Sequence, residues 1–294
     1  MPCSRQILRL RAWIPARVPV SILRGDISRA DLKTLHLLQR DPNIAINEVT
    51  AYVHYNLAMN CTKGPFSDNN VRLALKHAID REEIVEKVFL GHATPGNDNP
   101  IAPSIKYATD PEPRHVYDPD KAKYYLKQAG LSSLAVDLSA ADAAFAGAVD
   151  AAVLYREQAA KCGIDLNVVR EPNDGYWDNV WMKKDFCAGA WTGRPTCDWM
   201  FTIGYARDAA WNETFWDNAR FNELLVMARG ETDQAKRAAM YAEMQQLVHD
   251  DSGNIILAFN NLVGAHTTKL AHGPVVGSNA DMDGMKLAER WWFA

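Results

Sequence analysis

The chain has 294 residues, of which 48% are hydrophobic and 23% are charged, and a formal net charge of −4 at pH 7. This composition is typical of a globular protein with one large domain or two smaller ones. The negative net charge argues against a nucleic-acid partner, because that binding depends on basic patches that neutralise phosphates. Charges and prolines interrupt every apolar run before the roughly eighteen residues that a membrane-spanning helix requires.

The N-terminal segment, residues 1–25, is predicted to be irregular. Its arginines and prolines are scattered among apolar residues, so it lacks the apolar core of about 7–15 residues that an export signal contains. The next stretch predicts a helix over 31–39, a turn at 41–43 and a strand over 44–49. A longer strand over 51–60 is expected to cross between two bodies.

Two helices with clear starts are predicted around residue 80. Ser67 or Asp68 caps the first helix, and Asp80 with Glu83 has the form of a capping box for the second, which Gly91 ends. Five prolines over 92–117 predict a long ordered loop. A further helix is predicted over 118–130, starting at an Asp-Pro pair.

Strands and helices then alternate, which is typical of an α/β sheet with crossover helices. The predicted strands are 134–138, 164–170 and 186–191, and the predicted helices are 145–162 and 176–184. The remaining predictions are helices near 221–229 and 233–249, a strand over 254–265, and an aromatic end at 289–293.

No catalytic constellation is visible in the sequence. The eight histidines are dispersed, and none has the spacing with Glu that makes a metalloprotease face. Nucleophile elbows, Walker loops and dinucleotide fingerprints are also missing. We therefore expect no catalytic residue, no metal site and no cofactor.

Tryptophan is the unusual feature of the composition, with nine in the chain and six between residues 177 and 216. Aromatic residues at this density build either a core or a pocket that binds flat surfaces. Core packing is the favoured interpretation for Trp177 and Trp181, which lie four residues apart on the predicted helix. For Trp191 and Trp211, which flank the loop over 192–198, pocket and core are equally favoured.

The five cysteines form no C-x-x-C motif, which argues against zinc-ribbon and thioredoxin-like sites. Cys187 and Cys197 could pair in an oxidising compartment. The alternative is that both are small buried side chains.

Residues 65–85 read PFSDNNVRLALKHAIDREEIV. This segment resembles the signature of the family 5 solute-binding proteins, the dipeptide- and oligopeptide-binding type that serves ABC importers. The likeness continues through 91–96, 100–103 and 117–122, in the family's order. The resemblance implies an α/β fold: the second lobe of a two-lobed, type II periplasmic-binding-protein-like fold, plus a partial first lobe.

By that resemblance, residues 26–56 are a partial first lobe with a hinge strand, 57–253 are the solute-binding second lobe, and 254–294 are the hinge return with the rest of the first lobe. The implied partners are a peptide or other small-molecule ligand and an ABC permease in the membrane, with no nucleic acid and a monomeric state. The implied location is the periplasm, although this chain shows no signal peptide and resembles an N-terminally truncated family member.

The expected ligand wall comprises Trp191, Gly193, Arg194, Asp198, Trp211 and Asn212. Peptide binders of this family place an aspartate after a similar W-x-G stretch, and here Arg194 follows instead. Since a guanidinium prefers carboxylate or phosphate, the ligand group at that wall is expected to be anionic. The alternative is an ion pair of Arg194 with Asp198 or Asp208 that only holds the loop.

Two other functions stay open at this stage. One is a truncated remnant of such a receptor without a transport role. The other is an α/β hydrolase-like enzyme that uses Asp198, Asp208 or Glu213 as acid and base. The ligand itself is also open between a peptide, an opine-like conjugate, a sugar and a metal chelate.

Overall fold

The computed structural model describes residues 30–294, so the prediction for the segment 1–25 lies outside the described residues. Contacts between residues divide the chain into two units. Unit 2 is the continuous stretch Thr50–Asn261, and unit 1 contains the described residues on either side of it. The unit boundaries fall within two long strands, β1 (Ile44–Met59) and β6 (Asn254–Thr267).

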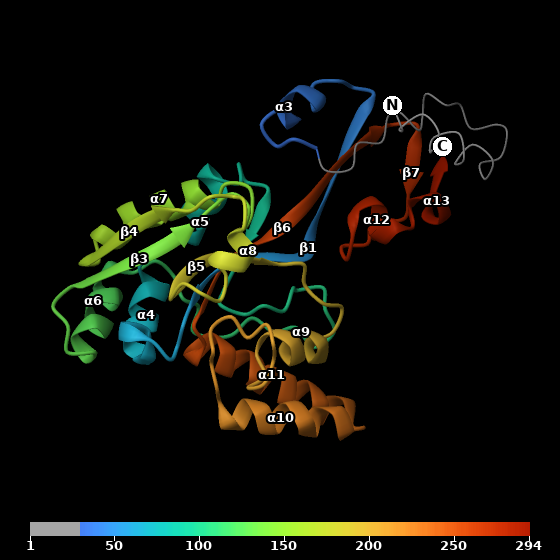
Figure 1. Cartoon of the computed structure of the whole chain (residues 1–294). Coiled ribbons are helices and arrows are strands. Elements are labelled where there is room, and N and C mark those ends of the chain that lie inside the picture. The colour runs from blue at the N-terminus through green and yellow to red at the C-terminus, as the bar shows by residue number, and fades with distance from the viewer. Residues whose placement is uncertain (1–29) are drawn as a thin grey trace. The chain divides into compact units, whose positions relative to one another are not determined.

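The main sheet has six strands in the order β2-β6-β1-β5-β3-β4. Its other members are β2 (Ala93–Pro95), β3 (Leu134–Ala140), β4 (Ile164–Arg170) and β5 (Phe186–Trp191). Strand β5 runs antiparallel to β1 and parallel to β3, while β3 and β4 are parallel. Helix α7 (Ala148–Ala160) connects β3 to β4 as a crossover and packs on both strands. This arrangement confirms the predicted alternation of strands and helices (Figure 1).

The helices of unit 2 begin where the sequence provides caps. Asp68 caps α4 (Asn69–His77) and Asp80 caps α5 (Arg81–Lys87), each by accepting a bond from a backbone N–H. Asp118 does the same for α6 (Pro119–Gln128), which has proline at its first position. A short 3₁₀ helix, Gly64–Ser67, precedes α4.

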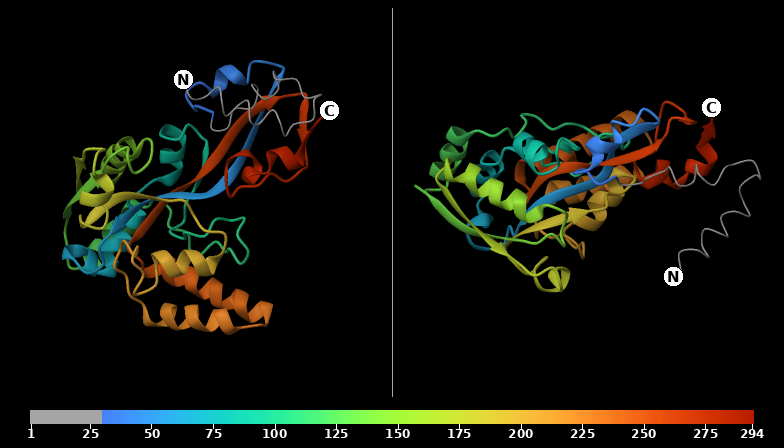
Figure 2. Two further views of the ribbon diagram at one scale, coloured as in Figure 1. Left: turned by 45° about the vertical axis from the view of Figure 1, so that its right-hand side comes forward. Right: turned by 90° about the horizontal axis from the view of Figure 1, so that it is seen from above.

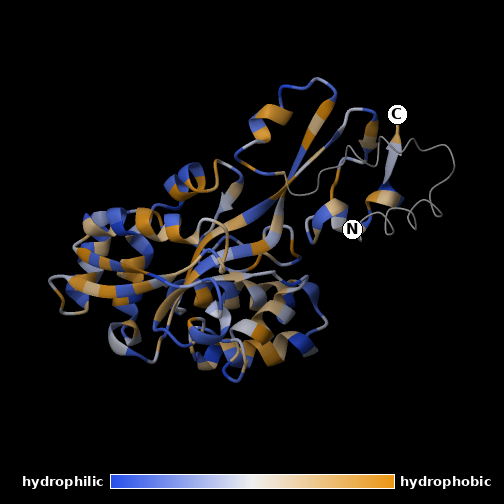
Figure 3. Ribbon diagram, turned by 45° about the horizontal axis from the view of Figure 1, so that its top comes forward, coloured by the Kyte–Doolittle hydropathy of each residue, from blue (hydrophilic) through white to orange (hydrophobic). Residues whose placement is uncertain are grey.

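Helices α9 (Cys197–Gly204), α10 (Ala219–Gly230) and α11 (Gln234–Asp251) gather in one group in unit 2 (Figures 1 and 2). Their apolar faces build a second core around Phe201, Phe221 and Met244. The first core lies around the sheet and α7, with the fully buried Leu57, Leu138 and Tyr155 among its members. Hydrophilic and hydrophobic residues alternate along these helices, as expected for helices that bury one face (Figure 3).

Unit 1 contains smaller elements. They are α3 (Leu35–Leu38), β7 (Leu270–His272), α12 (Asp281–Met285), α13 (Leu287–Arg290) and β8 (Trp291–Phe293). Strands β7 and β8 pair antiparallel in a sheet of their own. Within residues 30–294, no helix combines the length and the apolar character needed to cross a bilayer.

Two local predictions from the sequence were wrong. The helix predicted over 176–184 is confined to α8 (Tyr176–Asn179), because the chain reaches a left-handed conformation at Met182 with φ of 57°. The two strands predicted over 44–49 and 51–60 form one continuous strand, β1, since no turn residue separates them.

Candidate functional site

The candidate site begins at the end of the central strand β5. Trp191 is the last residue of that strand and pairs with His54 of β1. Only 5% of Trp191 is exposed, because its ring packs against Gly204 of α9. The sheet and α9 therefore fix the position of this indole before any ligand is present.

Gly193 allows the chain to turn at the end of β5 while its backbone stays in close contact with β1. Its φ is +62°, a left-handed conformation that glycine adopts without strain. A Cβ at this position would lie 2.2 Å from the backbone oxygen of Tyr52, so a side chain is sterically excluded. Gly193 is buried and does not line a cavity; its contribution is to direct the following residue, Arg194.

A cavity of about 450 Å³ opens beside the end of β5, and three of the predicted site residues line it. Its lining comprises Trp177, Asp178, Trp181, Ala190, Trp191, Thr192, Arg194 and Trp211. We call this cavity the tryptophan pocket. Its residues come from α8, β5 and the loops that follow α8, β5 and α9.

The four indoles of the tryptophan pocket are arranged in two edge-to-face pairs. The rings of Trp191 and Trp211 are 6.1 Å apart, and those of Trp177 and Trp181 are 5.8 Å apart. Trp177 and Trp211 are 43% and 48% exposed, so both present open ring surfaces. The prediction that Trp177 packs in the core was wrong, because α8 ends before it could bury that face.

The side chain of Glu213 positions two of these indoles, Trp181 and Trp191, by hydrogen bonds. This fully buried carboxylate accepts hydrogen bonds from Trp181 Nε1 at 2.5 Å and from Trp191 Nε1 at 2.8 Å. It also accepts one from Asn56 Nδ2 of β1 at 2.7 Å. Burial raises the pKa of Glu213, while the hydrogen-bonding side chains around it, Trp181 foremost, act in the opposite direction. The position of Gly189 in β5 makes room for this contact, since a Cβ there would lie 3.1 Å from Glu213 Oε2.

Arg194 forms no ion pair with a carboxylate of residues 30–294. Its Nη1 donates to Thr192 Oγ1 at 2.9 Å and to the Gly193 carbonyl at 2.7 Å. Its guanidinium lies over the ring of Trp199, 5.7 Å from the centroid. The alternative in which Asp198 pairs with Arg194 is therefore wrong, because Asp198 pairs with Arg229 at 2.7 Å instead.

Asp198 and Asn212, the two other predicted wall residues, do not line the tryptophan pocket. Asp198 lies in the first turn of α9 and is engaged by Arg229. Asn212 is buried, and its side chain donates to the carbonyls of Ala206 and Trp216. Asn212 thus holds the loop that carries Trp211, whereas Asp198 joins α9 to α10.

Cys187 and Cys197 are both free and buried, so the pairing considered from the sequence does not form. Cys187 lies within β5 and Cys197 starts α9, where its Sγ donates to the Lys106 carbonyl. Burial raises the pKa of each thiol to about 12.

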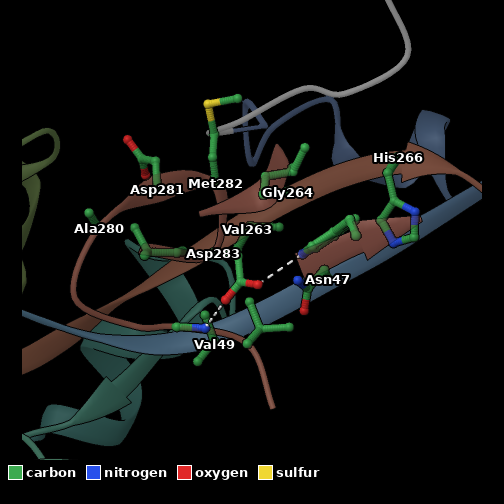
Figure 4. Close-up of a pocket in the computed structure, with 14 residues that line it drawn as sticks. Asn47, Val49, Val263, Gly264, His266, Ala280, Asp281, Met282 and Asp283 are labelled. Atoms are coloured by element: carbon green, nitrogen blue, oxygen red, sulfur yellow. Dashed lines mark hydrogen bonds between the residues drawn. The ribbon is translucent and has the colours of Figure 1, made fainter. Parts of the chain in front are cut away.

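Unit 1 contains a much smaller cavity of about 40 Å³ (Figure 4). Its central carboxylate, Asp283, accepts bonds from the backbone of Gly277 and from the side chains of Arg290 and Trp291. A space of this size holds about one water molecule. The hydrogen bonds around Asp283 join the segments Gly277, Arg290 and Trp291 of unit 1.

A histidine cluster in unit 2 brings together possible metal ligands. Ligand atoms of His115, His249 and Asp250 lie within 4.8 Å of one another. However, the rings of His115 and His249 stack at 3.8 Å with an interplanar angle of 10°. Their lone pairs lie in parallel planes and cannot converge on one ion. In addition, His115 Nδ1 is bonded to the buried Asp98.

The α/β fold, with its two units joined by long strands, is of the class found in two-lobed solute receptors. Residues 20–213 match the family model described as bacterial extracellular solute-binding proteins, family 5 Middle. The chain belongs to this family, as the signature at 65–85 predicted.

Curated relatives include the glutathione-binding protein GsiB of Escherichia coli (strain K12), which is 27% identical over 245 residues. That match covers 80% of this chain and 48% of the relative. GsiB of Pectobacterium atrosepticum is 26% identical over the same length, with 47% of the relative covered. The chain thus spans about half the length of the curated relatives it matches.

Solved structures confirm the fold class. HbpA2 of Haemophilus parasuis superposes with a TM-score of 0.76 at 21% identity, covering 84% of this chain and 50% of that one. The periplasmic binding protein DppA of Helicobacter pylori, solved with the peptide STSA, gives 0.70 at 24% identity, covering 84% and 49%. The predicted α/β fold of the two-lobed receptor type is confirmed by these similarities.

Proposed function

We propose that this chain is the solute-binding part of a receptor that delivers peptides or related small solutes to an ABC importer, and that it binds without catalysis. Residues 57–253 would form the solute-contacting lobe. Residues 26–56 and 254–294 would contribute the hinge strands and part of the other lobe. The observation that carries the proposal is the tryptophan pocket, in which four indoles and one cation surround a cavity of about 450 Å³.

The pocket suits a small ligand with both apolar and charged groups. Exposed indole faces supply wide contact surfaces at low entropic cost, and a few polar groups orient the ligand. One relative is named a glutathione-binding protein, and one similar structure contains a bound peptide. Glutathione and short peptides are therefore the first ligands to test, ahead of opine-like conjugates, sugars and chelates.

Two carboxylates named in the hydrolase-like alternative, Glu213 and Asp198, are poorly placed for acid or base catalysis. Glu213 is fully buried behind the indoles and accepts three hydrogen bonds, so it has no access to a substrate. Asp198 is neutralised by Arg229. These contacts favour a binding role over the hydrolase-like alternative. A hydrolase screen that found turnover abolished by Asp198→Ala would contradict this proposal.

The remaining parts of the proposal come from the family. Its members are described as extracellular solute-binding proteins, which supports a periplasmic location. An ABC permease would be the membrane partner, and the receptor would act as a monomer. Cell fractionation and co-purification with the permease would test these points together.

Equilibrium dialysis of the full chain against glutathione and against a tripeptide such as Ala-Ala-Phe tests the proposal. A ligand closes a two-lobed receptor through contacts with both lobes. We expect saturable binding of at least one of these solutes. Trp211→Ala should weaken this binding, whereas Trp292→Ala, which removes a similarly exposed indole of unit 1, should not.

The proposal is wrong if binding is unaffected by Trp211→Ala, because the solute would then bind elsewhere.

A further inference from the structure

Arg194 differs from the neighbouring arginines because it has no acidic partner among residues 30–294. Arg207 pairs with Asp217, and Arg229 pairs with Asp198, so their charges are neutralised within the fold. A guanidinium has five N–H donors, and both hydrogen bonds found for Arg194 leave from Nη1. Its Nε and Nη2 donors are therefore available to a ligand.

The guanidinium is also held in place before a ligand arrives. Its bonds to Thr192 and Gly193 restrict the side chain, and the ring of Trp199 lies beneath it. Arg194 is half-buried at the edge of the tryptophan pocket. A pre-oriented donor group loses little entropy when it binds a planar anion.

The electrostatic surroundings favour an anion at this position. Asp178 is the one acidic residue in the pocket lining, and it is exposed, so solvent screens it. The buried Glu213 is turned toward its three N–H donors behind the indoles. Nothing in the pocket lining thus neutralises Arg194, and the indoles beside it exclude water from one side, which strengthens a charged contact.

Resting on the proposed function, we infer that Arg194 recognises a carboxylate of the ligand. The pocket then takes anionic solutes that carry an apolar or flat group next to the carboxylate, and this group stacks on Trp177 or Trp211. The carboxylate can belong to the C-terminus of a peptide or to a free organic acid, since both offer the same planar group.

Two pairs of probes test this inference on the full chain. The first pair is the tripeptide Ala-Ala-Phe and its C-terminal amide, and the second is phenylacetate and phenylacetamide. In each pair the two molecules differ in charge and are nearly identical in shape. Titrations followed through the ¹⁵N-labelled indole signals report dissociation constants at the tryptophan pocket. Comparing the two pairs shows whether a peptide C-terminus or a free acid is the better source of the carboxylate.

For the unaltered chain we expect each acid to bind about tenfold more tightly than its amide, which is typical of one charge-assisted hydrogen-bonded contact. Arg194→Gln should abolish this preference while the amides bind as before. Arg156→Gln, which removes an exposed arginine of α7 outside the pocket, should leave the preference intact. Unchanged indole signals of Trp181 and Trp191 would show that the Arg194 variant retains the pocket.

The outcomes separate this inference from the proposed function. If acids and amides bind equally well, or if the preference survives Arg194→Gln, the pocket binds solutes but the carboxylate inference is wrong. If none of the four probes shifts the indole signals at tens of millimolar, the pocket is not a solute site, and both proposals fail.

Discussion

Replacing Glu213 by alanine tests whether this buried carboxylate organises the tryptophan pocket. The change removes an acceptor from Asn56, Trp181 and Trp191, although Asn56 Nδ2 still donates to Asn254 Oδ1 at 2.6 Å. Asn56 and Trp191 are buried, so water cannot replace the carboxylate easily. A buried donor that loses its partner costs about 1–3 kcal/mol.

Two such donors, together with the cavity left by the side chain, give an expected loss of about 3–5 kcal/mol in the free energy of unfolding. Removal of the buried carboxylate also offsets part of this loss of stability, because burial disfavours the ionised form of Glu213 in the folded protein. We therefore expect a net loss of about 3 kcal/mol.

Urea unfolding at pH 7 measures this loss as a lower midpoint. Glu213→Gln is the matched variant, because an amide oxygen placed at Oε1 still accepts from Asn56 and Trp191 while its NH₂ group faces the Trp181 donor. It should cost less than alanine and shift mainly the Trp181 indole signal. A loss below about 1 kcal/mol for Glu213→Ala, or unchanged indole signals, would refute this account.

Three further predictions follow from single residues. Gly193→Ala should lower the free energy of unfolding by more than about 2 kcal/mol, since its Cβ would meet the Tyr52 backbone; a urea midpoint equal to that of the unaltered chain would contradict this. Trp177→Ala should leave stability within about 1 kcal/mol, because the indole is 43% exposed, yet weaken tripeptide binding in dialysis; unchanged binding would remove Trp177 from the site. Burial lowers the pKa of His54 from 6.5 to about 4, so the unfolded chain takes up a proton more readily than the folded protein. The free energy of unfolding is therefore unaffected by His54 above pH 6.5 and falls below it, by about 3 kcal/mol at pH 4. Urea midpoints measured from pH 7 to pH 4 should therefore fall less steeply for His54→Phe, and an equally steep fall would show that His54 is not responsible.

Local signals in the sequence predicted the elements that depend on nearby residues. Strand β5 occupies the predicted positions 186–191, and Asp80 and Asp118 cap their helices as their spacing indicated. Cap residues and strand patterns act within a few positions of the chain, so one sequence is sufficient to find them.

The arrangement of the tryptophan pocket depends on contacts between residues that are far apart in the sequence, which local patterns cannot predict. Glu213 and Asn56 are 157 positions apart, and Glu213 reaches Asn56 of β1 and Trp191 of β5 from the loop that follows α9. The exposure of Trp177 likewise follows from the early end of α8, and helix α9 begins inside a segment that was interpreted as a loop. Aromatic density in the sequence predicted a role for Trp191 and Trp211, and the family resemblance predicted one for Arg194. All three line the tryptophan pocket.

The central claim is that a small solute binds at the tryptophan pocket. Photo-crosslinking of the full chain with a benzophenone-bearing tripeptide, followed by mass spectrometry of the fragments, tests it most directly. We predict that the crosslinks fall on 176–181, 190–194 and 211, and that unlabelled tripeptide in excess suppresses them. Crosslinks spread over the surface, or concentrated on the cavity of unit 1, would contradict the assignment of the pocket.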